Sequence, residues 1–465
     1  MKIVVLGLSL SVVIGMNLLK PADASGAIHT DDGLRKSSLV SQQLKAASEI
    51  NDSLTLKQCI KIALENNPVI GYKNWKIEEV NAQRKEASSQ RWPRLSAVGS
   101  YYHYSDTQRL APPRRPDYPL IFTDDMISWG LAVTMPLYTG GRITNEIRAT
   151  ELVQQSAEYS LDYARQELIF NVTSVYFSIL KQHKIIESLD FSQTTLEGHL
   201  SRVKELISAK KAARLDKLRI EVRLANIMQK IEQQKNIRAI QNRSLANLMG
   251  LKEINFYIPP QGELPFTEPK MDLEENLNQA FAHRADYHSA QKDVEAQAKR
   301  VKVANAGYWP SISLYATYGA KKAVGSFIKQ PEIDGYEDIG QVGIFLELPV
   351  FDGGKIKSNV QQEKAKLALL KEKLRELKLN IRLDVEAAIS NITSTGKRIS
   401  ATEKAIEQAN ESLRIEMEKY NLGKGSITDI FDAESALLEV QTIYYMALAD
   451  YSIYSAQLKF VQGKL

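Results

Sequence analysis

The chain has 465 residues, of which 44% are hydrophobic and 25% charged, with one cysteine and a formal net charge of +5. The apolar fraction is near the globular average and excludes disorder, and the single cysteine excludes a disulfide framework and a cysteine-based zinc site. Beyond the N-terminus, no run approaches the roughly 18 consecutive apolar residues of a spanning helix. The dispersed charge predicts no nucleic-acid partner.

The N-terminus has the pattern of a secretory signal peptide. A lysine precedes an apolar run from Ile3 to Leu19, and a small-x-small cleavage site ends at Ala24. We therefore expect residues 1–24 to be removed on export, which leaves 25–53 as an N-terminal extension. The alternative is a retained membrane anchor, because the apolar run is long for a signal.

The chain contains two copies of one unit. Leu56–Pro93 aligns with Leu273–Pro310 at an offset of 217, and both segments end in Trp-Pro. Farther on, Pro136–Arg142 aligns with Pro349–Lys355 at an offset of 213. Matches that recur in register indicate an internal duplication. Boundaries follow from it: a first repeat at 54–250, a proline-rich linker at 251–270 and a second repeat at 271–465.

Each copy contains a very long predicted helix. Apolar residues recur in steps of three and four from near each Gly-Gly pair to about residues 207 and 420. Some 65 helical residues extend about 100 Å, which is longer than a globular core. The narrow apolar stripe is typical of coiled-coil packing. The neighbours we expect are return helices at about 213–249 and 427–461, and other chains.

Four segments alternate as β-strands do, at about 95–105, 129–138, 311–319 and 340–351. One interpretation is two soluble hairpins packed on a helical core. The other is strands of a transmembrane barrel, which alternate in the same way and carry aromatic residues and long polar loops. Since bacterial barrels have at least about eight strands, this second interpretation requires several chains to pool theirs. The strand-to-helix junctions are turns built on Pro136, Gly140, Gly141, Pro349, Gly353 and Gly354.

The signal peptide, the duplicated unit, the hairpin and a Pro-x-x-x-Gly-Gly-(Arg/Lys) start to a very long helix together resemble the outer-membrane efflux protein (TolC-like) family. The resemblance covers about residues 53–462 and is most specific at Tyr420–Ala433. It implies a mainly α fold with a transmembrane β-barrel portion. In this fold, a homotrimer forms an α-helical tunnel in the periplasm and a shared 12-stranded barrel in outer-membrane lipid.

The resemblance also implies a function. The protein is expected to be the passive exit duct of a tripartite efflux or type I secretion system, energised by an inner-membrane transporter through a periplasmic adaptor (membrane fusion) protein. The alternative is a periplasmic coiled-coil structural or adaptor protein without a pore. The two differ in whether the four alternating segments face lipid.

Candidate pore residues follow from the same resemblance. Asp429 and Asp432 match carboxylates that line a constriction at the periplasmic tip, where threefold symmetry gathers them into a cation-favouring ring. Asp429 is equally a candidate cap for the return helix, and both roles can hold. Asp216 occupies the equivalent turn of the first copy, and a closing contact between Asp216 and Lys424 stays open.

The remaining tip candidates, implied as adaptor-docking residues, are Lys210, Lys211, Gly423, Lys424, Gly425 and Ser426. The first turn lacks the glycine that is usual in the family, and Gly425 stands where the family has an arginine. The basic residues of the first turn are alternatively ordinary solvated surface.

No catalytic chemistry is expected. Of the six histidines, only His283 and His288 are near each other in sequence, and we expect no metal site. The chain has neither a phosphate-binding loop motif nor a Gly-x-Ser-x-Gly nucleophile motif. The prediction is a protein without cofactors that is not an enzyme.

Overall fold

The computed structural model describes residues 54–110, 121–210, 212–252, 272–324, 327–328 and 336–465. The predicted signal peptide and N-terminal extension, most of the predicted linker, and Lys211 lie outside the described residues. All helices and strands named below belong to one unit of the chain.

The helices repeat in type and length between the two copies. The first copy contains α2 (Leu56–Asn66), α3 (Pro68–Ser89), α4 (Arg142–Ser208) and α5 (Arg214–Leu248). The second contains α6 (Leu273–His283), α7 (Ala285–Asn305), the short 3₁₀ turn η1 (Ala306–Tyr308), α8 (Lys355–Asn421) and α9 (Ile427–Val461). Helices α4 and α8 each have 67 residues, and α5 and α9 each have 35. This equality confirms the internal duplication.

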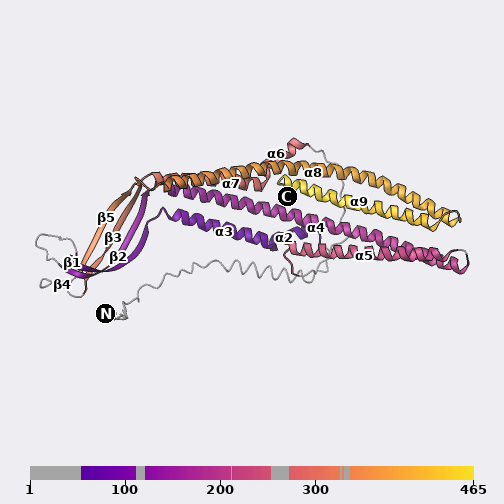
Figure 1. Cartoon of the computed structure of the whole chain (residues 1–465), viewed down its shortest axis with the longest axis horizontal. Helices are drawn as coiled ribbons and strands as arrows, with labels where there is room; N and C mark the ends of the chain where they lie inside the picture. Colours follow the sequence, from indigo (N-terminus) through magenta and orange to yellow (C-terminus); the bar gives the residue numbers. More distant parts are fainter. Residues whose placement is uncertain (1–53, 111–120, 211, 253–271, 325–326, 329–335) are drawn as a thin grey trace. The chain divides into compact units, whose positions relative to one another are not determined.

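The strands form one antiparallel sheet that joins the two copies (Figure 1). Its strands are β1 (Arg94–Arg109), β2 (Phe122–Tyr138), β3 (Ser311–Ala323), β4 (Phe327–Ile328) and β5 (Tyr336–Glu347). The order is β1-β2-β3-β5, with β4 paired to β2. The copies meet where β2 pairs with β3. Gly130 and Gly319 are opposite each other there, and a Cβ on Gly319 would lie 2.2 Å from the Trp129 carbonyl oxygen.

The long helices are held by apolar packing along narrow stripes. Helix α4 packs on α3 and α5 of its own copy and on α7 and α9 of the second copy, while α8 packs on α7 and α9. Near the α4–α5 and α8–α9 turns, apolar residues of α4, α5 and α9 form one buried cluster: Ile185, Leu189, Leu196, Val203, Ile220, Ile227, Ile231, Ile427, Ile430 and Phe431. The spacing of these residues by three, four or seven places them on one side of each helix.

Each return helix ends in the same way. Gly250 and Gly463 follow α5 and α9, and both have a φ of +70°, which only glycine adopts easily. A Cβ on Gly250 would lie 2.5 Å from the Asn66 carbonyl oxygen, and a Cβ on Gly463 would lie 2.5 Å from the His283 carbonyl oxygen. The end of each return helix is therefore pressed against the junction of the two short helices in its own copy.

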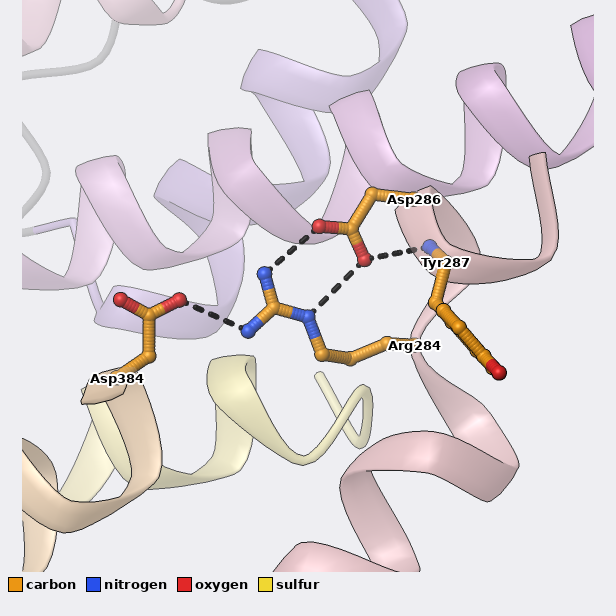
Figure 2. A network of polar contacts seen from close by, with 4 residues as sticks. All are labelled: Arg284, Asp286, Tyr287 and Asp384. Carbon is orange, nitrogen blue, oxygen red and sulfur yellow. Dashed lines mark hydrogen bonds and ion pairs between the residues drawn. The ribbon is translucent and has the colours of Figure 1, made fainter. Parts of the chain in front are cut away.

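In the second copy, this junction carries a buried arginine (Figure 2). Arg284 donates from Nε to Asp286 Oδ1 at 3.0 Å and from Nη2 to Asp286 Oδ2 at 2.7 Å. Its Nη1 donates to Asp384 Oδ2 on α8 at 2.9 Å. The guanidinium thus ties the α6–α7 junction to the middle of the long helix α8.

Across the described residues, no helix has a segment both long enough and apolar enough to cross a membrane.

Candidate functional site

The turn between α8 and α9 is built from glycine and a capping box. Gly423 has a φ of +71°, and the Lys424 amide donates to the Lys419 carbonyl at 2.9 Å, which closes the end of α8. Ser426 then caps α9. Its Oγ accepts from the Thr428 amide at 3.1 Å, and its own amide donates to Asp429 Oδ2 at 3.0 Å.

Asp429 therefore does cap the return helix, with one of its two carboxylate oxygens. Asp429 and Asp432 are both exposed, whereas Ile427, Ile430 and Phe431 on the other side of α9 are buried. Glu439 is exposed too, and its spacing of seven from Asp432 places it on the same side of the helix. The sequence analysis did not include Glu439, although its helical spacing from Asp432 was visible.

The turn between α4 and α5 has neither the glycine nor the capping side chain of the α8–α9 turn. Lys210 has a φ of +59° and occupies the position equivalent to Gly423. Among the described residues it is the only non-glycine with a positive φ. The first residue before α5 is Ala213, which has no side-chain oxygen to cap the helix. The side chains of Lys210, Lys424 and Ser426 are all exposed at their turns.

Polar contacts tie α9 to the first copy. His199 Nε2 on α4 is 3.2 Å from Glu434 Oε1, and Arg219 Nη1 on α5 donates to Thr428 Oγ1 at 3.1 Å. Sequence reasoning did not find these contacts, because their partners are more than 200 positions apart.

Among the described residues, the closing contact between Asp216 and Lys424 that the sequence left open is not formed. These two residues form no ion pair with each other in the described part of the chain. Asp216 is instead close to Tyr420, the next-to-last residue of α8. Burial and the nearby Asp216 carboxylate raise the pKa of the Tyr420 hydroxyl, while Arg202 partly opposes them.

The strand-to-helix junctions depend on left-handed glycines. Gly140 and Gly141 have φ values of +61° and +82°, and Gly353 and Gly354 have +64° and +88°. Pro136 lies at an irregularity near the end of β2, and Pro349 follows the end of β5.

The junction before α8 is also capped. Asp352 Oδ2 accepts from the Ile356 amide at 2.6 Å, and Oδ1 accepts from the Gly354 amide at 2.9 Å. These two hydrogen bonds hold the pKa of the Asp352 carboxyl below its usual range.

The architecture is that of outer-membrane channels. The chain is similar to the solved outer-membrane channel OprN, with a TM-score of 0.76, 18% identity, and coverage of 88% of this chain and 90% of that chain. It is also similar to the CmeC outer-membrane channel of Campylobacter jejuni, with a TM-score of 0.73, 17% identity, and coverage of 90% and 89%.

A family model described as outer membrane efflux protein matches residues 59–251 and again residues 276–464. The chain belongs to the outer membrane efflux protein family. It is 23% identical over 448 residues to the outer membrane protein TolC of Escherichia coli K12, covering 92% of this chain and 86% of that protein. It is 21% identical over 418 residues to the solvent efflux pump outer membrane protein SrpC of Pseudomonas putida, covering 86% and 83%.

Family membership confirms several expectations from the sequence. The protein is an outer-membrane efflux channel that extends into the periplasm, works with the other components of an efflux system, and is not an enzyme. The roles of individual residues at the turns and junctions stay predictions.

Proposed function

We propose that the protein is the outer-membrane exit duct of a tripartite efflux or type I secretion system and works as a homotrimer. The observation that carries the proposal is one face of the sheet. Cross-strand neighbours on this face are apolar in all four main strands: Leu95 pairs with Val133, Leu131 with Tyr318, and Leu314 with Ile344. The members of this face that are exposed include Leu95, Leu131, Tyr318, Val342, Ile344 and Leu346.

The opposite face of the sheet has a different composition. It presents Ser96, Ser100, Ser128, Gly130, Thr134, Ser313, Thr317, Gln341, Gly343 and Glu347, with Val98, Tyr102, Met126, Tyr315, Ile339 and Phe345 as apolar or aromatic exceptions. An apolar face toward lipid and a small or polar face toward water is the pattern of a transmembrane barrel. In the described residues, β1 and β5 each pair on one side only, and open edges of such length are normally covered.

Pairing β5 of one chain with β1 of the next chain covers both open edges. Three chains then supply the 12 main strands of a closed barrel, which exceeds the minimum of about eight. Reconstitution of the purified chain into planar bilayers tests this proposal. We expect an SDS-resistant trimer that gives discrete conductance steps. A monomer that produces no conductance would instead support the pore-free coiled-coil alternative.

At the other end of the long helices, Asp429 and Asp432 are proposed to form the constriction. The capping box uses only Oδ2 of Asp429, so the rest of both carboxylates is available to attract cations. The double variant Asp429→Asn, Asp432→Asn keeps a capping oxygen at position 429 and removes the charge. We expect weaker block by Mg²⁺ or by a trivalent hexammine complex. Glu274→Gln, at an exposed carboxylate on α6, is the matched control, and equal block in all three proteins would remove the aspartates from the pore.

The exposed turn residues are proposed to dock the periplasmic adaptor, which couples the duct to an inner-membrane transporter. Lys210, Lys424 and Ser426 are exposed at the two turns, beside Gly423 and Gly425. Charge reversal by Lys210→Glu with Lys424→Glu should reduce copurification of the adaptor while leaving single-channel conductance measurable. Unchanged recovery of the adaptor would place its docking site elsewhere.

A further inference from the structure

The hairpin of β1 and β2 is interrupted at its loop end. His103 is opposite Asp125, whereas Gln108 is opposite Thr123, so four residues of β1 face Asp124 alone. A bulge of this kind bends a strand and re-aims its side chains. Here it gathers side chains from both strands: one ligand atom each from His103, Asp124 and Asp125 lie within 4.8 Å of one another.

The chemistry of this cluster is specific. His103 Nδ1 is 2.8 Å from Asp125 Oδ1, and the Tyr101 hydroxyl donates to the same oxygen at 2.5 Å. One imidazole with two carboxylates is a donor set that first-row transition-metal ions accept readily. Mg²⁺ and Ca²⁺ prefer ligand sets made only of oxygen. The cluster therefore favours an ion of the Zn²⁺ type.

A second observation at Asp124 is independent of these distances. Its Oδ1 is buried and has no hydrogen-bond partner among the described residues. A carboxylate oxygen removed from water without a donor is costly, and such atoms in proteins are commonly satisfied by a bound ion or water. Neighbouring side chains supply no replacement donor: the Thr123 hydroxyl on β2 donates instead to the Asp125 carbonyl at 2.6 Å, and Leu110, Ile121 and Met126 are apolar and buried.

We propose that His103, Asp124 and Asp125 bind one divalent transition-metal ion, and that Tyr101 positions the Asp125 carboxylate. Ligands that share a Zn²⁺ ion at about 2.0–2.2 Å lie roughly 3–4 Å apart. The His103 side chain is 62% exposed and is free to rotate by the small amount required. The bound ion cross-links β1 to β2 where backbone pairing is missing. This proposal does not depend on the proposed duct function.

The sequence analysis expected no metal site because it considered only histidines near each other in the chain. His103 and Asp124 are 21 positions apart. They meet only through the register of the hairpin, which hydrophobic periodicity does not specify near a polar loop.

The test uses the full chain, purified in detergent without a histidine tag and stripped with a chelator. Calorimetric titration with Zn²⁺, and visible absorption with Co²⁺ as a spectroscopic probe, should reveal one site per chain. We expect His103→Ala and Asp124→Asn each to weaken Zn²⁺ binding by at least about tenfold, and Tyr101→Phe to weaken it by about tenfold through loss of the positioning hydrogen bond. Asp106→Asn, at an exposed carboxylate in the same bulge, is the matched control and should bind normally.

Two outcomes overturn the proposal. One is a wild-type chain that takes up no Zn²⁺ at micromolar concentrations, and the other is unchanged affinity and Co²⁺ spectrum in His103→Ala. Zn²⁺ should also slow amide exchange across residues 103–108 in the wild type but not in Asp124→Asn. Conductance measured on the same samples reports folding and channel formation separately, so a failed metal site is distinguishable from a failed duct.

Discussion

Replacing Arg284 with methionine measures how far the α6–α7 junction depends on one buried guanidinium. The side chain of Arg284 is only 6% exposed and donates three hydrogen bonds to two carboxylates. Burial disfavours its charge, but the hydrogen bonds that it donates to Asp286 and Asp384, together with the attraction of their charges, outweigh burial and raise the pKa of Arg284. The buried junction therefore holds a charged guanidinium, as is usual for arginine in proteins.

The magnitude follows from the exposure of its partners. Removing one member of a buried ion pair costs about 3–5 kcal/mol, because the other member is left buried and unpaired. Asp286 is 17% exposed, but Asp384 is 44% exposed and regains water. We therefore expect Arg284→Met to lower the free energy of opening this junction by about 3 kcal/mol, the lower end of that range. Since about 1.4 kcal/mol is a factor of ten, amide protection should fall roughly 100-fold.

Hydrogen exchange resolved to peptides of α6 and of the start of α7 provides the assay, because local opening is measured without unfolding the whole chain. Arg398→Met is the control. Arg398 pairs with Asp450 at 2.7 Å but is 44% exposed, so its loss should cost less than about 1 kcal/mol. Adding Asp286→Asn and Asp384→Asn to Arg284→Met should restore part of the protection. Equal protection loss in the Arg284 and Arg398 variants would refute the argument from burial.

Three further predictions concern backbone geometry and capping. Lys210→Gly should relieve the left-handed backbone at φ +59° and raise the free energy of unfolding by about 1 kcal/mol, measured as a higher denaturant midpoint. Gly463→Ala should lower the melting temperature, because a positive φ costs about 1–2 kcal/mol for other residues and the new Cβ meets the His283 carbonyl. The lowered pKa of Asp352 means that its cap stabilises the fold fully above the usual pKa of aspartate and is lost as pH falls through the lowered value. Asp352→Asn should therefore flatten the acid-unfolding profile, and an unchanged profile would assign the acid sensitivity to other carboxyls.

The long helices and the duplication were predictable because both leave strong regular patterns. Steps of three and four persist through α4 and α8, and the Gly-Gly pairs mark their starts. Strand ends were less predictable. β2 begins at Phe122, well before the alternating segment expected at 129, since Phe122, Thr123 and Asp125 pair through their backbone without showing hydrophobic alternation.

The candidate site was predictable only in part. The capping role of Asp429 was predictable because an acidic residue suits the start of a helix, whereas its reciprocal capping box with Ser426 came from the structure. Contacts between copies, such as His199 with Glu434, depend on how α4 packs against α9. A single sequence contains no local signal for such a contact. The missing glycine of the first turn was visible in the sequence, but the positive φ of Lys210 was not, since the loss of glycine does not by itself show that the replacing residue keeps the left-handed backbone.

The equal lengths of α4 and α8 place the two turns at the same distance from the shared sheet. Both begin at a glycine pair beside the shared sheet, and both end at a turn 67 residues later. Deleting one heptad from α4 alone would draw its turn back by about 10 Å and leave the other turn in place. The same deletion made in both long helices and in both return helices would move the two turns by the same distance. The lengths of α4 and α8 therefore have to change together if the two turns are to stay level.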